Sequence, residues 1–157
     1  MTTCSLSFPS QINLAKLPTP MQPLRRLSER YGVELYVKRD DLSGIALSGN
    51  KIRKLEFVLA DALAQKTDTV ITCGGAQSNH CRATAIAAAM LGLKCRLILR
   101  TPDPSNPPPL EGNILLDRMT GAEILWITPD EYRQRDELMA REAGVPPDVR
   151  ENSLHDT

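Results

Sequence analysis

A lysine at the start of a predicted helix, followed by two more cations in the same turn, is the feature of this sequence best suited to chemistry. The cations are Lys51, Arg53 and Lys54, and they follow Gly49 and Asn50. A helix N-terminus carries about half a positive charge, so each cation there costs about 0.3–1 kcal/mol. A bound anion would offset that cost, because the free N–H groups of a helix N-terminus bind phosphates. Neighbouring positive charge also favours a neutral lysine, which is a nucleophile that forms Schiff bases.

Two other interpretations of this stretch compete with a reactive amine beside a phosphate. One is a solvated basic turn, since helix propensity is only a weak guide to structure. The other is a nucleotide-binding P-loop, because Gly44 and Gly49 have the spacing of the GxxxxGK[ST] motif. That motif fails, since Asn50 precedes Lys51 and Ile52 stands where a serine or threonine should contact magnesium.

A second candidate for ligand binding is the turn Gly74-Gly75-Ala76-Gln77, which follows a short apolar run at 69–73. Ser78 comes next and is expected to cap an alanine-rich helix over 78–91. A glycine pair lets the backbone approach an anion closely. Open α/β sheets bind ligands at the carboxyl ends of their strands, where this turn would lie. The GxGxxG pattern of dinucleotide sites is absent.

The elements that must position these residues alternate between strands and helices, which predicts an α/β fold with an open parallel sheet flanked by helices. Hydrophobic periodicity and turn residues predict helices at 24–31, 50–66, 78–91, 110–120 and 129–143, and strands at 33–39, 69–73, 94–100 and 122–127. The stripe Ile52, Leu55, Val58, Leu59, Ala62 and Leu63 should form the buried face of the helix that begins with the lysine. Thr128 to Glu131 reads as a capping box.

The composition excludes several classes of partner. The formal net charge is +0, from 19 acidic and 19 basic residues, and aromatic residues make up only 4%. A nucleic-acid partner is therefore not expected. No apolar run approaches the ~18 residues of a membrane span. The N-terminus lacks the features of a secretory signal, which favours a cytoplasmic location. With 2 histidines and no CxxC spacing, no metal site is expected.

Four linked segments carry a family resemblance: Tyr36 to Leu42, Gly49 to Glu56, Gly74 to His80, and Gly112 to Asp117. In this order they resemble the D-cysteine desulfhydrase and 1-aminocyclopropane-1-carboxylate deaminase family. These enzymes depend on pyridoxal 5′-phosphate (PLP) and have the tryptophan-synthase-β-like fold, PLP fold type II. The resemblance covers the chain from about Pro18 to Arg141. It implies that PLP is attached to Lys51.

The resemblance also implies roles for other residues. The catalytic residues would be Lys51 and Ser78, the cofactor would be held by Lys51, Asn50, Lys54 and Asn79, and the substrate by Ser78, Gln77 and His80. For several of these a structural interpretation remains open. Asn79 and Ser78 could simply cap a helix. His80 could be a hydrogen-bonded helix-start side chain, and Lys54 a surface lysine.

As to reaction, the resemblance implies a lyase that converts D-cysteine to pyruvate, ammonia and hydrogen sulfide, with the cyclopropane amino acid as the alternative substrate. Family members are considerably longer homodimers. We therefore expect a truncated chain, with residues 1–49 from a largely missing large domain, 50–143 as a small α/β domain, and 144–157 as a disordered tail. A catalytically inactive fragment that serves as a binding partner is the other alternative.

Overall fold

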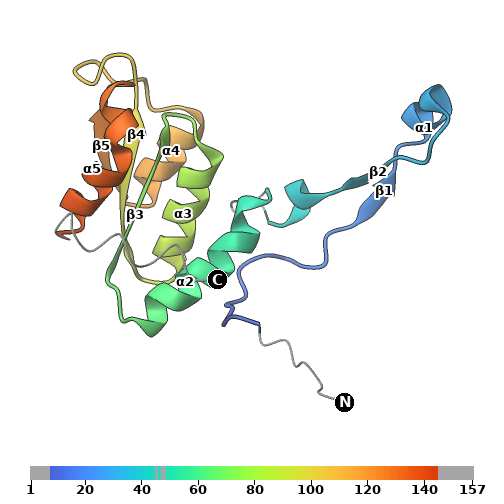
Figure 1. Ribbon diagram of the computed structural model, residues 1–157, viewed down its shortest axis with the longest axis horizontal. Coiled ribbons are helices and arrows are strands. Elements are labelled where there is room, and N and C mark those ends of the chain that lie inside the picture. Colours follow the sequence, from blue (N-terminus) through green and yellow to red (C-terminus); the bar gives the residue numbers. More distant parts are fainter. Residues whose placement is uncertain (1–7, 45, 47–48, 145–157) are drawn as a thin grey trace. The chain divides into compact units, whose positions relative to one another are not determined.

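The computed structural model describes residues 8–44, 46 and 49–144. The chain divides into two compact units, Met1–Thr67 and Asp68–Thr157, and Figure 1 shows the elements of each. Apart from Gly144, the tail predicted at 144–157 lies outside the described residues. No helix in the described part of the chain is long and apolar enough to cross a membrane.

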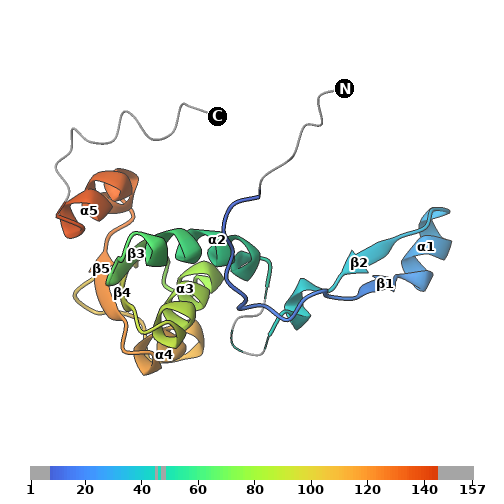
Figure 2. The same ribbon diagram turned by 90° about the horizontal axis from the view of Figure 1, so that it is seen from below.

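The first unit contains a two-stranded antiparallel ribbon, β1 (Met21–Pro23) with β2 (Tyr36–Lys38), and α1 (Arg25–Tyr31) connects the two strands. Figure 2 shows α1 at the end of this ribbon. The prediction of α1 is confirmed, and Gly32 ends it in the left-handed conformation at φ 68°. The predicted strand at 33–39 is shorter than expected, and β1 was not predicted because Pro18 and Pro20 precede it and Pro23 ends it. Proline is tolerated there because, among the described residues, β1 pairs with β2 alone.

The ribbon is followed by a short 3-10 helix, η1 (Asp40–Leu42), and by α2 (Lys51–Ala64). The predicted apolar stripe of α2 is correct for Ile52, Leu55 and Leu59, which are 0%, 3% and 1% exposed. It is wrong for Val58 and Leu63, which are 57% and 37% exposed. Val58 lies about a third of a turn from Leu59 on a helix, so both cannot occupy the centre of one face. The buried face instead includes Glu56, at 1% exposure.

The second unit is built on a parallel sheet in the order β3-β4-β5, which confirms the predicted fold class. Its elements are β3 (Thr69–Gly75), α3 (Asn79–Met90), β4 (Lys94–Arg100), α4 (Gly112–Met119), β5 (Glu123–Ile127), η2 (Glu131–Gln134) and α5 (Arg135–Glu142). Helices α3 and α4 cover one face of the sheet and α5 covers the other (Figures 1 and 2). The carboxyl ends of the strands align, since Gly75 pairs with Arg100 and Arg100 with Ile127.

The core of this unit lies between α3 and the central strand β4. Leu97, Ile98 and Leu99 are each 0% exposed, as expected for a strand buried on both faces. Small side chains on α3 let the helix pack closely on the sheet; those in the core are Cys81, Ala85 and Ala88. Burial raises the pKa of the Cys81 thiol to about 11, so this cysteine is a neutral core residue.

The predicted helix at 129–143 is two elements, η2 and α5. The capping box does form. The Thr128 main-chain N–H donates to Glu131 Oε2 at 2.7 Å, and the Glu131 N–H donates to Thr128 Oγ1 at 3.2 Å. It opens the 3-10 helix η2, and α5 follows directly at Arg135.

Candidate functional site

The lysine predicted to be reactive is the first residue of α2. Lys51 is exposed, and among the described residues its side chain has no hydrogen bond or ion pair. Asn50 occupies the N-cap position but makes no side-chain capping bond. Lys54, in the same turn, is also exposed. The start of α2 therefore presents two cationic side chains to solvent.

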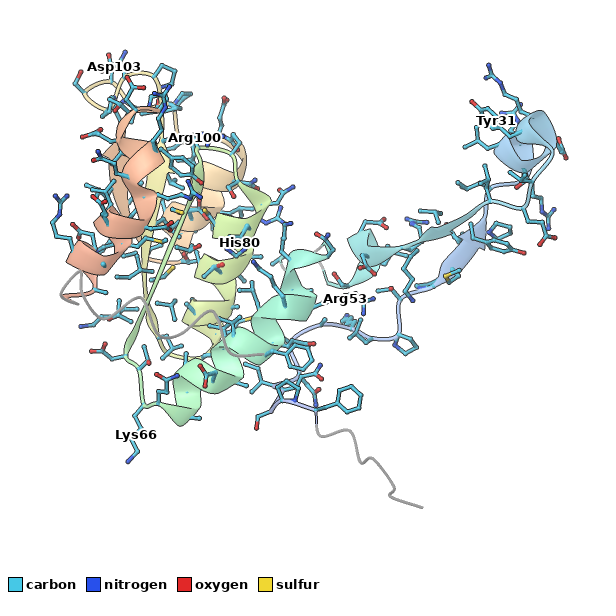
Figure 3. All side chains as sticks on the ribbon, viewed as in Figure 1. Tyr31, Arg53, Lys66, His80, Arg100 and Asp103 are labelled. Carbon is cyan, nitrogen blue, oxygen red and sulfur yellow. The ribbon has the colours of Figure 1, made fainter. Side chains whose placement is uncertain are left out.

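The third cation of this turn is neutralised within the protein. The Arg53 guanidinium donates to both carboxylate oxygens of Asp40, from Nε at 2.8 Å and from Nη2 at 2.7 Å. The same Nη2 donates to Thr19 Oγ1 at 3.0 Å, and that hydroxyl donates to Asp40 Oδ1 at 2.8 Å. Figure 3 labels Arg53 on α2. The bonds from Arg53 and then from Thr19 lower the pKa of Asp40 to about 2. Asp40 is thus the anion that offsets one of the three cations.

Asp40 also fixes the loop that leads into α2. Its main-chain carbonyl accepts a hydrogen bond from the Gly49 N–H at 2.9 Å. The Ser43 hydroxyl, on a fully buried residue, lies 2.8 Å from the Asp40 carbonyl oxygen and 3.2 Å from that of Gly49, so its one hydrogen is shared between these two acceptors. Gly49 has φ 104°, a conformation that favours glycine. These bonds set the direction in which the backbone enters Asn50 and Lys51.

In the second unit, the predicted ligand turn joins β3 to α3. Gly74 is packed so tightly that a Cβ would lie 2.6 Å from Cys81 Sγ and 2.8 Å from Ser78 Oγ. At Gly75 a Cβ would meet nothing within 4 Å. The first glycine is therefore needed for packing, and the second leaves the backbone open to its surroundings.

Ser78 caps α3, as the sequence predicts. Its Oγ accepts a hydrogen bond from the Cys81 N–H at 3.3 Å, and its backbone is extended at φ −70° and ψ 120°. The capping bond uses Oγ as an acceptor. The hydroxyl hydrogen can still be donated to a ligand while Ser78 caps the helix.

The next side chains of this turn contact the start of α4. Asn113 Nδ2 donates to Asn79 Oδ1 at 3.0 Å and to the main-chain carbonyl of Gln77 at 2.8 Å. The Gln77 amide accepts from the Asn113 N–H at 2.8 Å and donates to the carbonyl of Glu111 at 3.2 Å. Asn113 lies in the motif Gly112 to Asp117, but no role was predicted for it. An asparagine directly after a glycine at a helix start was the available signal.

His80, labelled in Figure 3, is half-buried in the first turn of α3. Its Nε2 lies 3.0 Å from Thr72 Oγ1. This contact matches the structural interpretation of His80, and its predicted contact with a substrate stays a prediction. The predicted site residues thus form two groups, at the start of α2 in the first unit and at the start of α3 in the second.

A buried carboxylate that the sequence did not single out lies one turn beyond Asn113. Asp117 is 0% exposed, and neither of its oxygens has a hydrogen-bond partner among the described residues. Burial raises the pKa of this carboxyl to about 6, against the lowering effect of the Arg82 charge on α3. The Asp117 carboxylate therefore balances the charge of Arg82, but no hydrogen bond from the described residues offsets the cost of burying it.

Asp117→Asn is expected to stabilise the chain at neutral pH. A raised pKa means that the folded protein keeps a proton that the unfolded chain loses, so stability falls as the pH rises from about 4 to about 6. The difference between a pKa of 3.8 in the unfolded chain and about 6 in the folded protein corresponds to a loss of up to about 3 kcal/mol in the free energy of unfolding. Urea unfolding at about pH 4 and about pH 8 measures it. An equal effect of the substitution at both pH values would contradict the assignment.

A hollow lies at the amino ends of the strands. A cavity of about 380 Å³ is lined by residues that include Thr69, Lys94 and Glu123, the first residues of β3, β4 and β5. Ligands of open parallel sheets bind at the carboxyl ends instead. The turn between β3 and α3 therefore remains the candidate site of this unit.

Most of the chain also matches known proteins. Residues 12–149 match the family described as pyridoxal-phosphate dependent enzyme. The chain is 52% identical over 128 residues to a Thermotoga maritima protein provisionally named 1-aminocyclopropane-1-carboxylate deaminase, and covers 40% of that protein. It is 51% identical over 122 residues to the mitochondrial bifunctional D-cysteine desulfhydrase/1-aminocyclopropane-1-carboxylate deaminase of Arabidopsis thaliana, and covers 30% of it. These alignments take in 82% and 76% of the present chain.

The fold is also shared with solved structures. A crystal structure of a homologue of 1-aminocyclopropane-1-carboxylate deaminase superposes with a TM-score of 0.73 at 40% sequence identity, over 86% of this chain and 41% of that one. The chain thus spans less than half the length of the relatives it matches. Because the family match extends over most of the sequence, this chain belongs to the family of pyridoxal-phosphate dependent enzymes.

Proposed function

We propose that this chain provides the lysine-bearing part of a PLP-dependent lyase that converts D-cysteine and water to pyruvate, ammonia and hydrogen sulfide. The observation that carries the proposal is the exposed Lys51 amine, which is unpaired among the described residues while its neighbour Arg53 is bound to Asp40. An unpaired primary amine is the group that PLP requires for covalent attachment. Both names carried by the Arabidopsis relative suit this site, so the cyclopropane amino acid is the alternative substrate.

The other donors are of the type that PLP requires. The Asn79 side chain uses its oxygen as an acceptor for Asn113, which leaves its NH₂ group available to donate to an oxygen of the cofactor. Asn50 and Lys54 flank the attachment lysine, and Lys54 would act as a point charge toward the phosphate. The open backbone at Gly75 adds room beside the turn.

When bound, PLP withdraws electrons from the α-carbon of an amino acid. Once the amine of the substrate has displaced Lys51 from the cofactor, the freed Nζ would take the proton from that carbon and pass it to the departing sulfur. The Ser78 hydroxyl would donate to the substrate, with Gln77 and His80 as neighbouring contacts. Loss of the β-thiol as hydrogen sulfide would follow from proton removal.

The domain division, the homodimer and the cytoplasmic location stay predictions. We propose that residues 1–49 are the N-terminal segment of a larger domain and that 50–143 form the smaller one. The absence of buried residues on α1 is consistent with this, since a helix without a buried face requires packing partners.

PLP uptake tests the proposal. The 157-residue chain and a chimera, in which this chain replaces the matching segment of the Thermotoga maritima relative, are each titrated with PLP, reduced with borohydride and mapped by mass spectrometry. We expect a reduced adduct on Lys51 in the chimera. An adduct on another lysine, or none in the chimera, would overturn the proposal. Uptake by neither protein would favour a non-catalytic binding partner.

Turnover by the chimera, measured against that of the unaltered Thermotoga maritima relative that supplies the rest of its sequence, separates the two substrates. With D-cysteine, sulfide and pyruvate should appear in equal amounts. With the cyclopropane amino acid, 2-oxobutyrate should appear without sulfide. Faster turnover of the cyclopropane amino acid would replace the first assignment with the second.

Ser78→Ala is expected to lower the turnover of the chimera by at least tenfold while leaving its PLP content unchanged, because the hydroxyl is assigned to the substrate. Loss of the cap should cost about 1 kcal/mol, too little to unfold the domain. Turnover, PLP stoichiometry and melting temperature are measured on the same preparation. Unchanged turnover with a lowered melting temperature would leave Ser78 only its capping role.

A further inference from the structure

Asn113, at the start of α4, is bonded entirely to residues of the turn and helix opposite. Its main-chain N–H donates to Gln77 Oε1 at 2.8 Å, and its Nδ2 donates to the Gln77 carbonyl at 2.8 Å and to Asn79 Oδ1 at 3.0 Å. Its Oδ1 accepts a hydrogen bond from Arg82 Nη1 at 3.2 Å. One half-buried amide thus joins α4 to the turn that carries Asn79.

The direction of each amide in this network is set by Arg82. A guanidinium has only donors, so the Asn113 oxygen must face Arg82 and its NH₂ group must face Gln77 and Asn79. Asn79 must then turn its oxygen toward Asn113. Its own NH₂ group points away from Asn113 and has no partner among the described residues.

The close approach of the two segments also depends on Gly112. This glycine has φ 55°, and a Cβ there would lie 2.7 Å from Gln77 Oε1. The residue before Asn113 therefore has no side chain, which lets Gln77 reach the start of α4. The buried Asp117, one turn further along α4, supplies the charge that faces Arg82.

We propose that Asn113, oriented by Arg82, is a positioning residue that holds the Asn79 amide with its NH₂ group outward as a donor to the cofactor. This inference rests on the proposed function, because it assumes that PLP is the ligand beside Asn79. Asn113 itself would not touch PLP. Its effect is to remove the alternative amide orientation, in which Asn79 would present an oxygen to an electron-rich oxygen of the cofactor.

Asn113→Asp is the sharpest test, because it keeps the shape and the acceptor for Arg82 but replaces the NH₂ donor with an oxygen. Asn79 must then turn its NH₂ group toward residue 113. In the PLP-loaded chimera, we expect the pH midpoint of the visible absorption band to rise by about one unit and the affinity for PLP to fall about tenfold. Asn106→Asp makes the same chemical change on an exposed loop and should alter neither quantity.

A second readout needs no cofactor. In the isotope-labelled 157-residue chain, NMR should show rapid solvent exchange of the Asn79 NH₂ protons in the wild type and exchange at least fivefold slower in Asn113→Asp. A merely structural role for Asn113 predicts the opposite, because the substitution would loosen the turn and the Asn79 NH₂ protons would then exchange with solvent faster. If Asn113→Asp does not fold, Asn113→Ala serves as the second variant. It frees the Asn79 amide to rotate, and the pH midpoint of the visible absorption band in the chimera should rise by less than it does in Asn113→Asp.

The outcomes separate the two proposals. If the wild-type chimera binds PLP on Lys51 and Asn113→Asp leaves its band midpoint unchanged, the positioning role is overturned and the proposed function stands. Slow exchange of the Asn79 NH₂ protons in the cofactor-free wild type would also overturn the positioning role alone. A wild-type chimera that takes up no PLP would overturn both.

Discussion

Lys51→Ala is expected to abolish the borohydride-reducible PLP adduct and all turnover of D-cysteine in the chimera. The exposed amine is the only group assigned to covalent attachment, and alanine offers no nucleophile. The fold should be unaffected, because Lys51 is exposed, makes no hydrogen bond or ion pair with the described residues, and is replaced by a better helix former. Removal of a cation from a helix start should even favour α2 slightly. Absorption spectra, mass spectrometry after reduction and thermal unfolding measure the three effects.

Two matched substitutions sharpen this test. Lys51→Arg keeps the positive charge but removes the reactive amine, and we expect it to lose the adduct as completely as alanine does. Lys16→Ala removes an exposed lysine of the same unit and should change nothing. Retention of the adduct in Lys51→Ala at the wild-type level would show that another lysine holds the cofactor.

The sequence was most informative where a pattern is local. The strand before Gly74, the cap at Ser78 and the left-handed end of α1 at Gly32 each follow from residues close in the chain, and each is confirmed. The parallel sheet also follows, because short apolar runs that alternate with helices have few other arrangements. The predicted helix start at Lys51 is confirmed, and the reactivity of Lys51 stays a prediction.

The sequence was least informative where a polar residue serves a distant partner. The cationic turn suggested a bound anion, yet Asp40 already binds Arg53 from 13 positions away. Asn113 and Arg82 were given no role, because their contact joins two helices 31 positions apart. Hydrophobic periodicity predicts which face of a helix is buried, but it cannot predict which polar groups meet across that face.

Glu56 is the strongest example of such a contact. It lies on the buried face of α2 and accepts three hydrogen bonds from a segment more than forty positions earlier. The main-chain N–H groups of Leu14 and Ala15 donate to its Oε1, and Gln11 Nε2 donates to its Oε2, each at 2.8 Å. The Ile12 N–H adds a bond to the Glu56 carbonyl at 3.2 Å. One carboxylate thus holds residues 11–15 on the helix that begins with Lys51.

Glu56→Ala is therefore expected to destabilise the first unit by about 3–5 kcal/mol, because main-chain donors with low solvent access lose a charged acceptor. Glu56→Gln should cost only about 1 kcal/mol, since its Oε1 can still accept from Leu14 and Ala15 while Gln11 rotates. Asp61→Ala, an exposed carboxylate on the same helix, should stay within about 0.5 kcal/mol. Urea unfolding gives these values, and hydrogen exchange at Leu14 and Ala15 locates the change. Equal costs for Glu56→Ala and Asp61→Ala would show that the carboxylate holds nothing in solution.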